Sequence, residues 1–423
     1  MKVLIFALAN ILALTQASIL LEPAQSKSYE NYSVLRIEVH TKEEFDLLST
    51  LGDLHFWNEG RVGGHADVMV SPDALQEVQK QLLRRNFQFS TMIENVGKLM
   101  KLEKVPAGGD RDEVKAEHPM TWTEYHSQDD IEAYLDYLAA TYDFVEVESI
   151  GESFEGRPMR VIKACKGGCG NKPAMWIDGG IHAREWIGPA SVSWMIKEVI
   201  ENDADHPELL ENLDWYILPI HNPDGYAYSQ SSDRMWRKTR SSHPGIGLCK
   251  GTDANRNYGY HWNDGGSSNL GCSDTYMGPE AFSEVENRNV RDFILAHKDQ
   301  IKFFNTIHSY SQLILLPWGF TTENAPGYDK LMNMANKGNE ALYAVHQTSY
   351  EAGCIPCLLY VASGGSMDWA LGEAGIPYSY GMELRDTGRY GFILPADQII
   401  PTAEETWAFH KTAAEIIIQE FAQ

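Results

Sequence analysis

The chain of 423 residues has few basic side chains for its number of acidic ones. It contains 35 Lys and Arg against 59 Asp and Glu, which gives a formal net charge of -24 at pH 7. Binding along a nucleic-acid backbone depends on cations that replace the counterions of the phosphates, and this composition offers no excess of them. The charge balance therefore argues against a nucleic-acid partner.

Long apolar runs are also scarce. The main one, residues 3–14, follows Lys2 and precedes the small residues Thr15 and Ala17. This is the pattern of a secretory signal peptide over residues 1–17, cleaved after Ala17. A membrane anchor is the alternative, but the run is shorter than the roughly 20 residues that a spanning helix needs. No later segment is long and apolar enough to span a bilayer, so we expect a secreted, soluble mature protein with no membrane partner.

Cysteine is limited to six residues: Cys165, Cys169, Cys249, Cys272, Cys354 and Cys357. In a secreted chain these side chains are expected to be oxidised, and their spacing alone leaves the pairing open. The close pairs Cys165/Cys169 and Cys354/Cys357 also fit a structural zinc site. That alternative needs reduced thiolates in an oxidising compartment, so disulfides are favoured.

A small α/β unit is predicted near the start of the chain. Alternating polarity predicts strands over residues 32–40, 66–72 and 87–95, and helical patterns cover 41–53 and 71–85. Thr41 followed by Glu44, and Ser71 followed by Pro72, are signals of helix starts. The chain's only N-glycosylation sequon, Asn31-Tyr32-Ser33, lies in this unit.

The segment after this unit reads as a connection. A linker helix is predicted over 92–105, and residues 104–120 then combine glycine, proline and charge without hydrophobic periodicity. Arg111 and Lys115 lie there, in a setting that a protease can reach.

A longer α/β pattern starts at about Thr121. A helix is predicted from Ser127, with Asp130 placed as its capping partner. Apolar runs at residues 174–180, 215–222, 303–309 and 378–386 then alternate with helical patterns. Buried strands that alternate with helices predict a sheet covered on both faces, with its site at the carboxyl ends of the strands.

Polar side chains lie within or just after three of these buried runs. His182 and Glu185 follow the first run, His308 interrupts the third, and Glu383 interrupts the fourth. Two histidines and one carboxylate match a catalytic zinc site that keeps a position for water. A lone histidine at a strand end is more often a hydrogen-bonded core or surface residue, so His182 and Glu185 alone leave the question open.

Six motifs in order carry a resemblance to a known family. They are DGGIHAREWIGPA, MWRKTR, DANRNY, IHSYSQLILLPWG, YVASGGSMDWA and MELRDTGRYGFILP. From about Thr121 to the C-terminus the chain resembles the zinc metallocarboxypeptidases of the pancreatic A/B type, and the unit before it resembles their inhibitory propeptide. The resemblance implies a mixed sheet with helices on both faces, preceded by a small α/β open sandwich. It implies a propeptide over 18–111, with a globular part at about 29–93 and a linker helix to about 105, and a catalytic domain over 112–423.

The same resemblance implies one zinc ion per chain, held by His182, Glu185 and His308. Glu383 matches the family's general base and acid, a role that fits a carboxylate beside a metal site. Arg240, in MWRKTR, matches the residue that polarises the scissile carbonyl and stabilises its oxyanion. Without the other motifs, Arg240 would be interpreted as part of a solvent-exposed basic surface.

Further residues match the family's substrate contacts. Asn255, Arg256 and Tyr360 correspond to the clamp for the terminal carboxylate, which the planar guanidinium can bind through two parallel hydrogen bonds. Arg184 and Tyr310 are further expected substrate contacts. The positions that line the pocket for the last side chain fall on Leu315, Gly319, Ile355, Ala362, Met367 and Gly381. Relatives that remove Lys or Arg carry an acidic residue at the position of Met367, so we expect aliphatic and aromatic C-terminal residues to be preferred.

Two further expectations follow from the resemblance. Cys249 and Cys272 match a disulfide common in the family, whereas the other four cysteines do not, and we expect local bridges within each close pair, with a cross-link between the pairs as the alternative. The small unit is expected to cover the active-site crevice until a trypsin-like protease cleaves after Arg111, with Lys115 as the next candidate. Peptide and protein C-termini are the expected substrates, and a digestive role rests on family analogy alone. The alternatives are an inactive homologue that only binds peptide C-termini, and a zinc amidase or esterase of small molecules.

Overall fold

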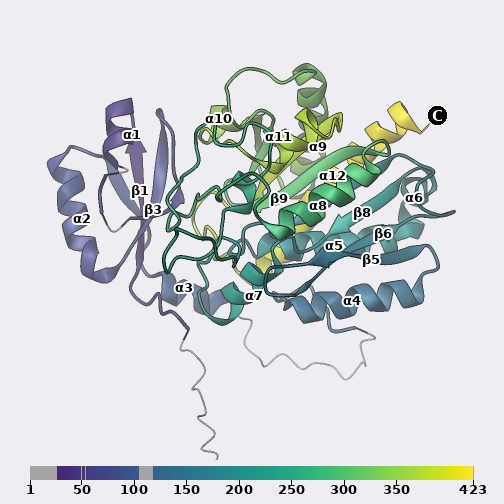
Figure 1. The fold of residues 1–423 in the computed structure, drawn as a ribbon, viewed down its shortest axis with the longest axis horizontal. Coiled ribbons are helices and arrows are strands. Elements are labelled where there is room, and N and C mark those ends of the chain that lie inside the picture. Colours follow the sequence, from purple (N-terminus) through teal and green to yellow (C-terminus); the bar gives the residue numbers. More distant parts are fainter. Residues whose placement is uncertain (1–25, 49, 53, 104–117, 423) are drawn as a thin grey trace, which may run out of the picture.

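The computed structural model describes residues 26–48, 50–52, 54–103 and 118–422, which form a small N-terminal unit beside a larger one (Figure 1). The predicted signal peptide with Ala17, and the predicted cleavage positions Arg111 and Lys115, lie outside these residues.

The small unit is an antiparallel sheet with two helices on one face. Its strands lie in the order β2-β3-β1-β4 and are β1 (Ser33–Val39), β2 (His55–Asn58), β3 (Gly64–Val70) and β4 (Phe89–Ile93). Its helices are α1 (Lys42–Leu48), α2 (Pro72–Arg84) and the connecting α3 (Val96–Glu103). The predicted starts of α1 and α2 are confirmed, because Thr41 Oγ1 accepts the Glu44 N–H and Ser71 Oγ accepts the Ala74 N–H. Strand β2 was not predicted, since four residues are too few to establish an alternating pattern.

The two faces of this sheet pack against different partners. On one face Leu35, Ile37 and Val68 form a core with helices α1 and α2. On the other face, Val34 and Trp57 belong to a cluster that includes residues of the larger unit. Because alternate strand residues point to opposite faces, β1 serves both cores at once. The small unit is therefore held against the larger one by an apolar face of its sheet.

The larger unit is built on an eight-stranded mixed sheet in the order β11-β10-β12-β9-β7-β8-β6-β5. The strands are β5 (Val145–Glu152), β6 (Pro158–Ala164), β7 (Ala174–Gly179), β8 (Asp214–Leu218), β9 (Ile301–Ser309), β10 (Leu313–Leu316), β11 (Glu351–Cys354) and β12 (Tyr378–Leu384). The helices are α4 (Gln128–Thr141), α5 (Ile187–Ile200), α6 (Pro207–Asn212), α7 (Pro223–Ser231), α8 (Val285–His297), α9 (Tyr328–His346), α10 (Ile355–Leu358), α11 (Ser366–Gly372) and α12 (Ile399–Phe421). The central strands β12, β9, β7 and β8 are parallel, and antiparallel pairs flank them.

Both faces of the central strands are buried under helices. In β7, Met175 and Ile177 point into a core shared with α4, α5, α9 and α12, whereas Trp176 points into a second core with α8 and α11. This explains the nearly continuous apolar runs in the sequence and confirms the prediction of a sheet covered on both faces. The capping box predicted for Ser127 and Asp130 is present at the start of α4.

Strand register brings the carboxyl ends of three parallel strands to one place. Glu383 of β12 lies opposite His308 of β9, and Ile307 of β9 lies opposite Gly179 of β7. The loop that follows Gly179 carries His182 and Glu185, so these four polar side chains converge at one edge of the sheet.

The disulfides are Cys165–Cys169, Cys249–Cys272 and Cys354–Cys357, as predicted. Among the helices of the described residues, none has the length and apolar character that crossing a membrane requires.

Candidate active site

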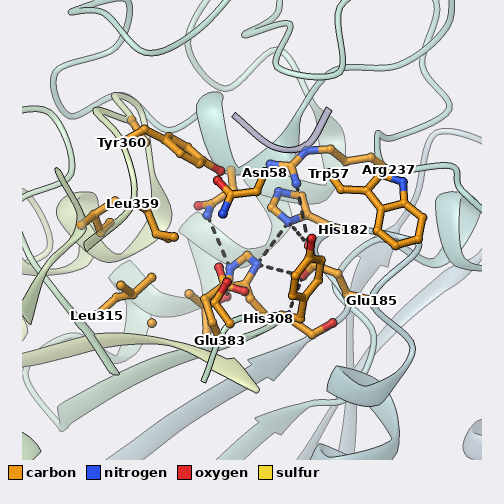
Figure 2. A pocket seen from close by; sticks show the side chains of 18 of the residues that line it. Trp57, Asn58, His182, Glu185, Arg237, His308, Leu315, Leu359, Tyr360 and Glu383 are labelled. Carbon is orange, nitrogen blue, oxygen red and sulfur yellow. Dashed lines mark hydrogen bonds and ion pairs between the residues drawn. The ribbon is translucent and has the colours of Figure 1, made fainter. Parts of the chain in front are cut away.

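His182, Glu185 and His308 form a buried cluster at the carboxyl ends of β7 and β9 (Figure 2). One ligand atom from each lies within 4.8 Å of the others. Glu185 Oε1 is 2.8 Å from Nδ1 of His182, and Oε2 is 3.0 Å from Nδ1 of His308. Their exposed fractions are only 2–4%, which keeps competing water away from the cluster.

The chemistry of these donors fits a metal ion. The two Nδ1 atoms of His182 and His308 face each other at 3.1 Å. Neutral imidazoles that direct lone pairs at each other repel, whereas a cation between them is bound by both. Two imidazole nitrogens and one carboxylate oxygen are the set that zinc takes in hydrolytic sites, where the fourth position is left to water or substrate.

The rear nitrogen of His182 is held by a buried carboxylate. Nε2 of His182 lies 3.0 Å from Oδ1 of Asp253, and Oδ2 of Asp253 accepts hydrogen bonds from Nη2 and Nε of Arg237 at 2.8 and 3.1 Å. Burial alone would raise the pKa of Asp253, but the charges of Arg237 and then His182 lower that pKa well below its ordinary value. An ionised Asp253 fixes the tautomer and orientation of His182, as carboxylates behind metal-ligating histidines do.

Glu383 lies beside this cluster on the neighbouring strand. The pKa of Glu383 is raised to about 8, chiefly by burial; the charge of His308 opposes this rise, and the charge of Glu185 adds to it. A carboxyl group in such an environment can take up and release a proton near neutral pH.

The arginine that lies at this site is Arg237, so the placement predicted for Arg240 is wrong. Arg237 lines the cleft with the cluster, and its Nη1 lies 3.7 Å from Glu185 Oε1. Arg240 instead stacks on Tyr228, with 3.6 Å from the guanidinium carbon to the ring centre, and its Nε lies 3.7 Å from Glu155. The cause is the loop path: the Ala183 N–H donates to the Arg237 carbonyl, which fixes Arg237 beside the metal cluster and leaves Arg240 beyond it.

Asn255, Arg256 and Tyr360 lie together along the cleft, as predicted. Asn255 and Arg256 form a 3-10 turn, and the Asn255 N–H donates to Asp253 Oδ1. The Arg256 guanidinium is fixed by bonds to the carbonyls of Asn255 and Gly266 and lies 5.8 Å from the Tyr360 ring centre. These residues therefore present a positioned cation and an amide on the side of the cleft where a peptide's end can bind.

Arg184 and Tyr310, the other expected substrate contacts, both touch the small unit. Tyr310 lines the cleft, and its hydroxyl donates to Asp67 of β3 at 2.7 Å. Arg184 does not line the cleft; its Nη2 donates to the carbonyl of Phe56 at 3.4 Å, and its guanidinium stacks on Phe392.

The predicted specificity residues, with one exception, form one wall of the cleft. Those that line it are Leu315, Ile355, Ala362, Met367 and Gly381, with Leu359 and Thr306 as additional residues that the sequence analysis missed. Gly319 stands directly behind this wall. A Cβ on Gly319 would lie 2.6 Å from the Ala362 carbonyl and 3.0 Å from the Ile355 side chain, so the packing there requires glycine.

Trp57 and Asn58 of the small unit also line the cleft and close it (Figure 2), which the sequence did not predict. Trp57 is 6% exposed and packs against Phe392 and Tyr310, with ring centres 5.2 and 6.4 Å apart. Both residues belong to β2, which the sequence pattern did not predict. No sequence motif marks a residue that enters the cleft of another unit.

Polar bonds hold this cover in place. Asp67, which receives the Tyr310 hydroxyl, is also paired with Arg36 through two bonds of 2.7 Å. Buried Glu103 at the end of α3 binds the guanidinium of buried Arg234, with 2.9 Å between Oε2 and Nε. Together with the apolar face described above, these contacts hold Trp57 and Asn58 at the cleft.

This fold and site define a metal-dependent peptidase whose cleft is covered by its own N-terminal unit. Residues 131–409 match the zinc carboxypeptidase family, and residues 35–103 match the carboxypeptidase activation peptide. The chain belongs to the zinc carboxypeptidase family, as a zymogen that carries an activation peptide, and uses zinc.

Named relatives agree with this assignment. The chain is 50% identical over 299 residues to carboxypeptidase B of Astacus astacus, covering 70% of this chain and 98% of the relative. It is 42% identical over 402 residues to carboxypeptidase A1 of Bos taurus, covering 92% of this chain and 95% of the relative. The structure of thrombin activatable fibrinolysis inhibitor is similar over 93% of this chain and 100% of that one, with a TM-score of 0.84 and 33% identity.

Proposed function

We propose that the activated protein removes aliphatic and aromatic residues from the C-termini of peptides and proteins. The observation that carries this proposal is the single cleft that joins the metal cluster, the Asn255/Arg256/Tyr360 group and an uncharged pocket wall. The metal cluster supports hydrolysis, the cation supports recognition of a free carboxylate, and the wall supports choice of the last side chain.

His182, Glu185 and His308 would hold the zinc ion. Bound zinc polarises a carbonyl and makes water more acidic. Glu383 lies where it can take the proton of the attacking water and pass it to the departing amine. The fixed positive charge of Arg237 stabilises the oxyanion that forms at the scissile carbonyl.

Arg256 and Asn255 bind the terminal carboxylate, and Tyr360, beside Arg256 in the cleft, completes this clamp. A planar guanidinium can make two parallel hydrogen bonds to a carboxylate, which restricts hydrolysis to the end of a chain. A peptide amide lacks the charge that this clamp recognises. This argues against the alternative of a small-molecule amidase.

The pocket composition decides between two substrate classes, because the relatives include both A and B carboxypeptidases. Met367 cannot pair with a cation, and burying an unpaired Lys or Arg side chain is costly. Asp368, the next residue, does not line the cleft; both of its carboxylate oxygens lie within 3.0 Å of the Gly319 nitrogen. At Gly381 an added Cβ would lie 3.2 Å from Met367 Sδ, so a larger residue there would crowd Met367 and narrow the pocket.

We further propose that the protein is secreted and is activated by a trypsin-like protease that cleaves after Arg111. The blocked cleft supports the need for cleavage, since Trp57 and Asn58 lie in the substrate path. Once the connection is cut, the small unit is held only by non-covalent contacts and can leave.

One experiment tests the proposed activity. The zymogen is treated with trypsin, the trypsin is inhibited, and a peptide that ends in Phe is offered as the free acid and as the amide. We expect rapid release of Phe from the acid alone, little release before trypsin treatment, and loss of activity with a zinc chelator. Equal attack on acid and amide, or on neither, contradicts the proposal.

A further inference from the structure

The sequon Asn31-Tyr32-Ser33 lies at the entry to β1 in the activation unit. Asn31 is exposed and adopts a left-handed backbone conformation with φ 63°, whereas Tyr29 and Ser33 on either side are buried. Asparagine tolerates this conformation better than most residues. The turn therefore leaves Asn31 exposed to solvent between two buried neighbours.

Hydrogen bonds orient the Asn31 amide. Its Oδ1 accepts a hydrogen bond from Asn95 Nδ2 at 3.0 Å, and its main-chain N–H donates to Asn95 Oδ1 at 3.1 Å. Nδ2 of Asn31, the atom that carries sugar in N-linked glycans, makes no hydrogen bond within the described part of the chain. A glycosylated amide keeps its carbonyl oxygen, so a glycan on Nδ2 leaves both contacts with Asn95 intact.

The serine of the sequon shows when modification has to occur. Ser33 is 4% exposed, and its hydroxyl donates to the carbonyl of Glu94 at 2.9 Å. An enzyme that reads the Ser33 hydroxyl together with the Asn31 amide cannot reach it in the folded unit. The transfer therefore precedes folding, while the chain enters the secretory compartment, and the fold then accommodates the product.

We propose that Asn31 is N-glycosylated, which rests on the proposed secretion. The donor is a lipid-linked oligosaccharide pyrophosphate: a bond forms between Asn31 Nδ2 and the anomeric carbon, and the bond from that carbon to the phosphate oxygen breaks. Nδ2 loses one proton, and the lipid pyrophosphate leaves with the bonding electrons. Since Asn31 precedes the activation linker, the zymogen carries the glycan and the mature peptidase does not.

The test uses the full chain, secreted from animal cells and digested with an amidase that removes N-linked glycans. We expect a mass decrease, conversion of Asn31 to Asp in the matching peptide, and, after trypsin activation, glycan only on the released fragment. The Asn31→Gln variant should migrate like the deglycosylated wild-type protein. The matched control is Asn86→Gln, because Asn86 is also exposed with φ 60° in this unit but has no sequon, and this variant should keep the wild-type shift.

The possible failures are distinguishable. Secreted, activatable protein without any mass change overturns the glycan site and leaves the proposed peptidase activity standing. Glycan mass on the mature domain also overturns it. A chain that stays inside the cell without glycan overturns both secretion and modification.

Discussion

Substitution of Arg237 by alanine should nearly abolish catalysis, whereas the same substitution at Arg240 should not. Arg237 is 7% exposed, lines the cleft and lies 3.7 Å from Glu185. Arg240 lies outside the cleft, stacked on Tyr228 and Trp236. Two arginines separated by two residues thus differ in whether they can reach a scissile carbonyl.

The sizes of the two effects follow from these surroundings. Loss of one donor to an oxyanion costs about 10² to 10³ in kcat, which is roughly 2.7–4 kcal/mol of transition-state stabilisation. Arg237→Ala also leaves Asp253 buried without its guanidinium partner, so the free energy of unfolding should fall by about 3 kcal/mol. Arg240→Ala loses cation–π contacts worth about 1 kcal/mol at a partly exposed site. Its kcat should remain close to the wild-type value.

The assay measures kcat and KM of the trypsin-activated variants on a peptide that ends in Phe, with thermal unfolding as the control for folding. Arg237→Lys keeps a charge but not the paired donors to Asp253, and should recover part of the stability and less of kcat. A folded Arg240→Ala with kcat lowered about a hundredfold, beside an active Arg237→Ala, would refute the assignment.

Two further predictions concern the pocket wall and a buried carboxyl group. Serine at both Cys354 and Cys357 should raise KM for the Phe peptide about tenfold with less effect on kcat, because this bridge fixes the turn that places Ile355 in the pocket. Burial raises the pKa of Glu286 from about 4.5 to about 7, so the folded state binds this proton more tightly than the unfolded state does. The resulting stabilisation, up to about 3 kcal/mol, is fully present below about pH 4.5 and is lost as the pH rises to about 7. Chemical unfolding of wild type and Glu286→Gln at pH 5 and pH 8 measures it.

Each of these has its own control. The bridge Cys165–Cys169 is equally local but lies away from the cleft, so serine at both positions should leave KM unchanged. An equal rise of KM in both double variants would contradict the pocket role of the first bridge. For Glu286, any constant cost of the amide cancels between the two pH values, and a stability difference that does not change with pH would contradict the burial argument.

Local signals in the sequence predicted much of the fold. The capping pair Ser127 and Asp130 starts a helix where predicted, because a cap depends on residues three apart. The convergence of His182, His308 and Glu383 was also predictable, because parallel strands place their carboxyl ends at one edge. That Glu185 and His308 belong to one site was implied by the resemblance, and the pairing of β7 with β9 in the sheet is what brings them together.

The errors have equally physical causes. Arg237 and Arg240 share one short motif, and which of them faces the cleft depends on a backbone bond from Ala183, a contact that sequence spacing does not encode. Trp57 enters the cleft from a strand of four residues at a sheet edge, where no periodicity can accumulate. Contacts between separate units depend on how the surfaces of the two folded units fit together, and local sequence patterns do not predict this fit.

The most direct test of the proposed specificity is the ratio of kcat/KM for two peptides that differ only in a final Phe or Lys, measured on the activated enzyme. The uncharged wall around Met367 predicts that Phe is favoured by at least about a hundredfold, since each 1.4 kcal/mol of unpaired burial is about a factor of ten. Met367→Asp should shift that ratio towards Lys. If the wild-type enzyme instead releases Lys faster than Phe, the pocket has been misread and the proposed substrate class is wrong.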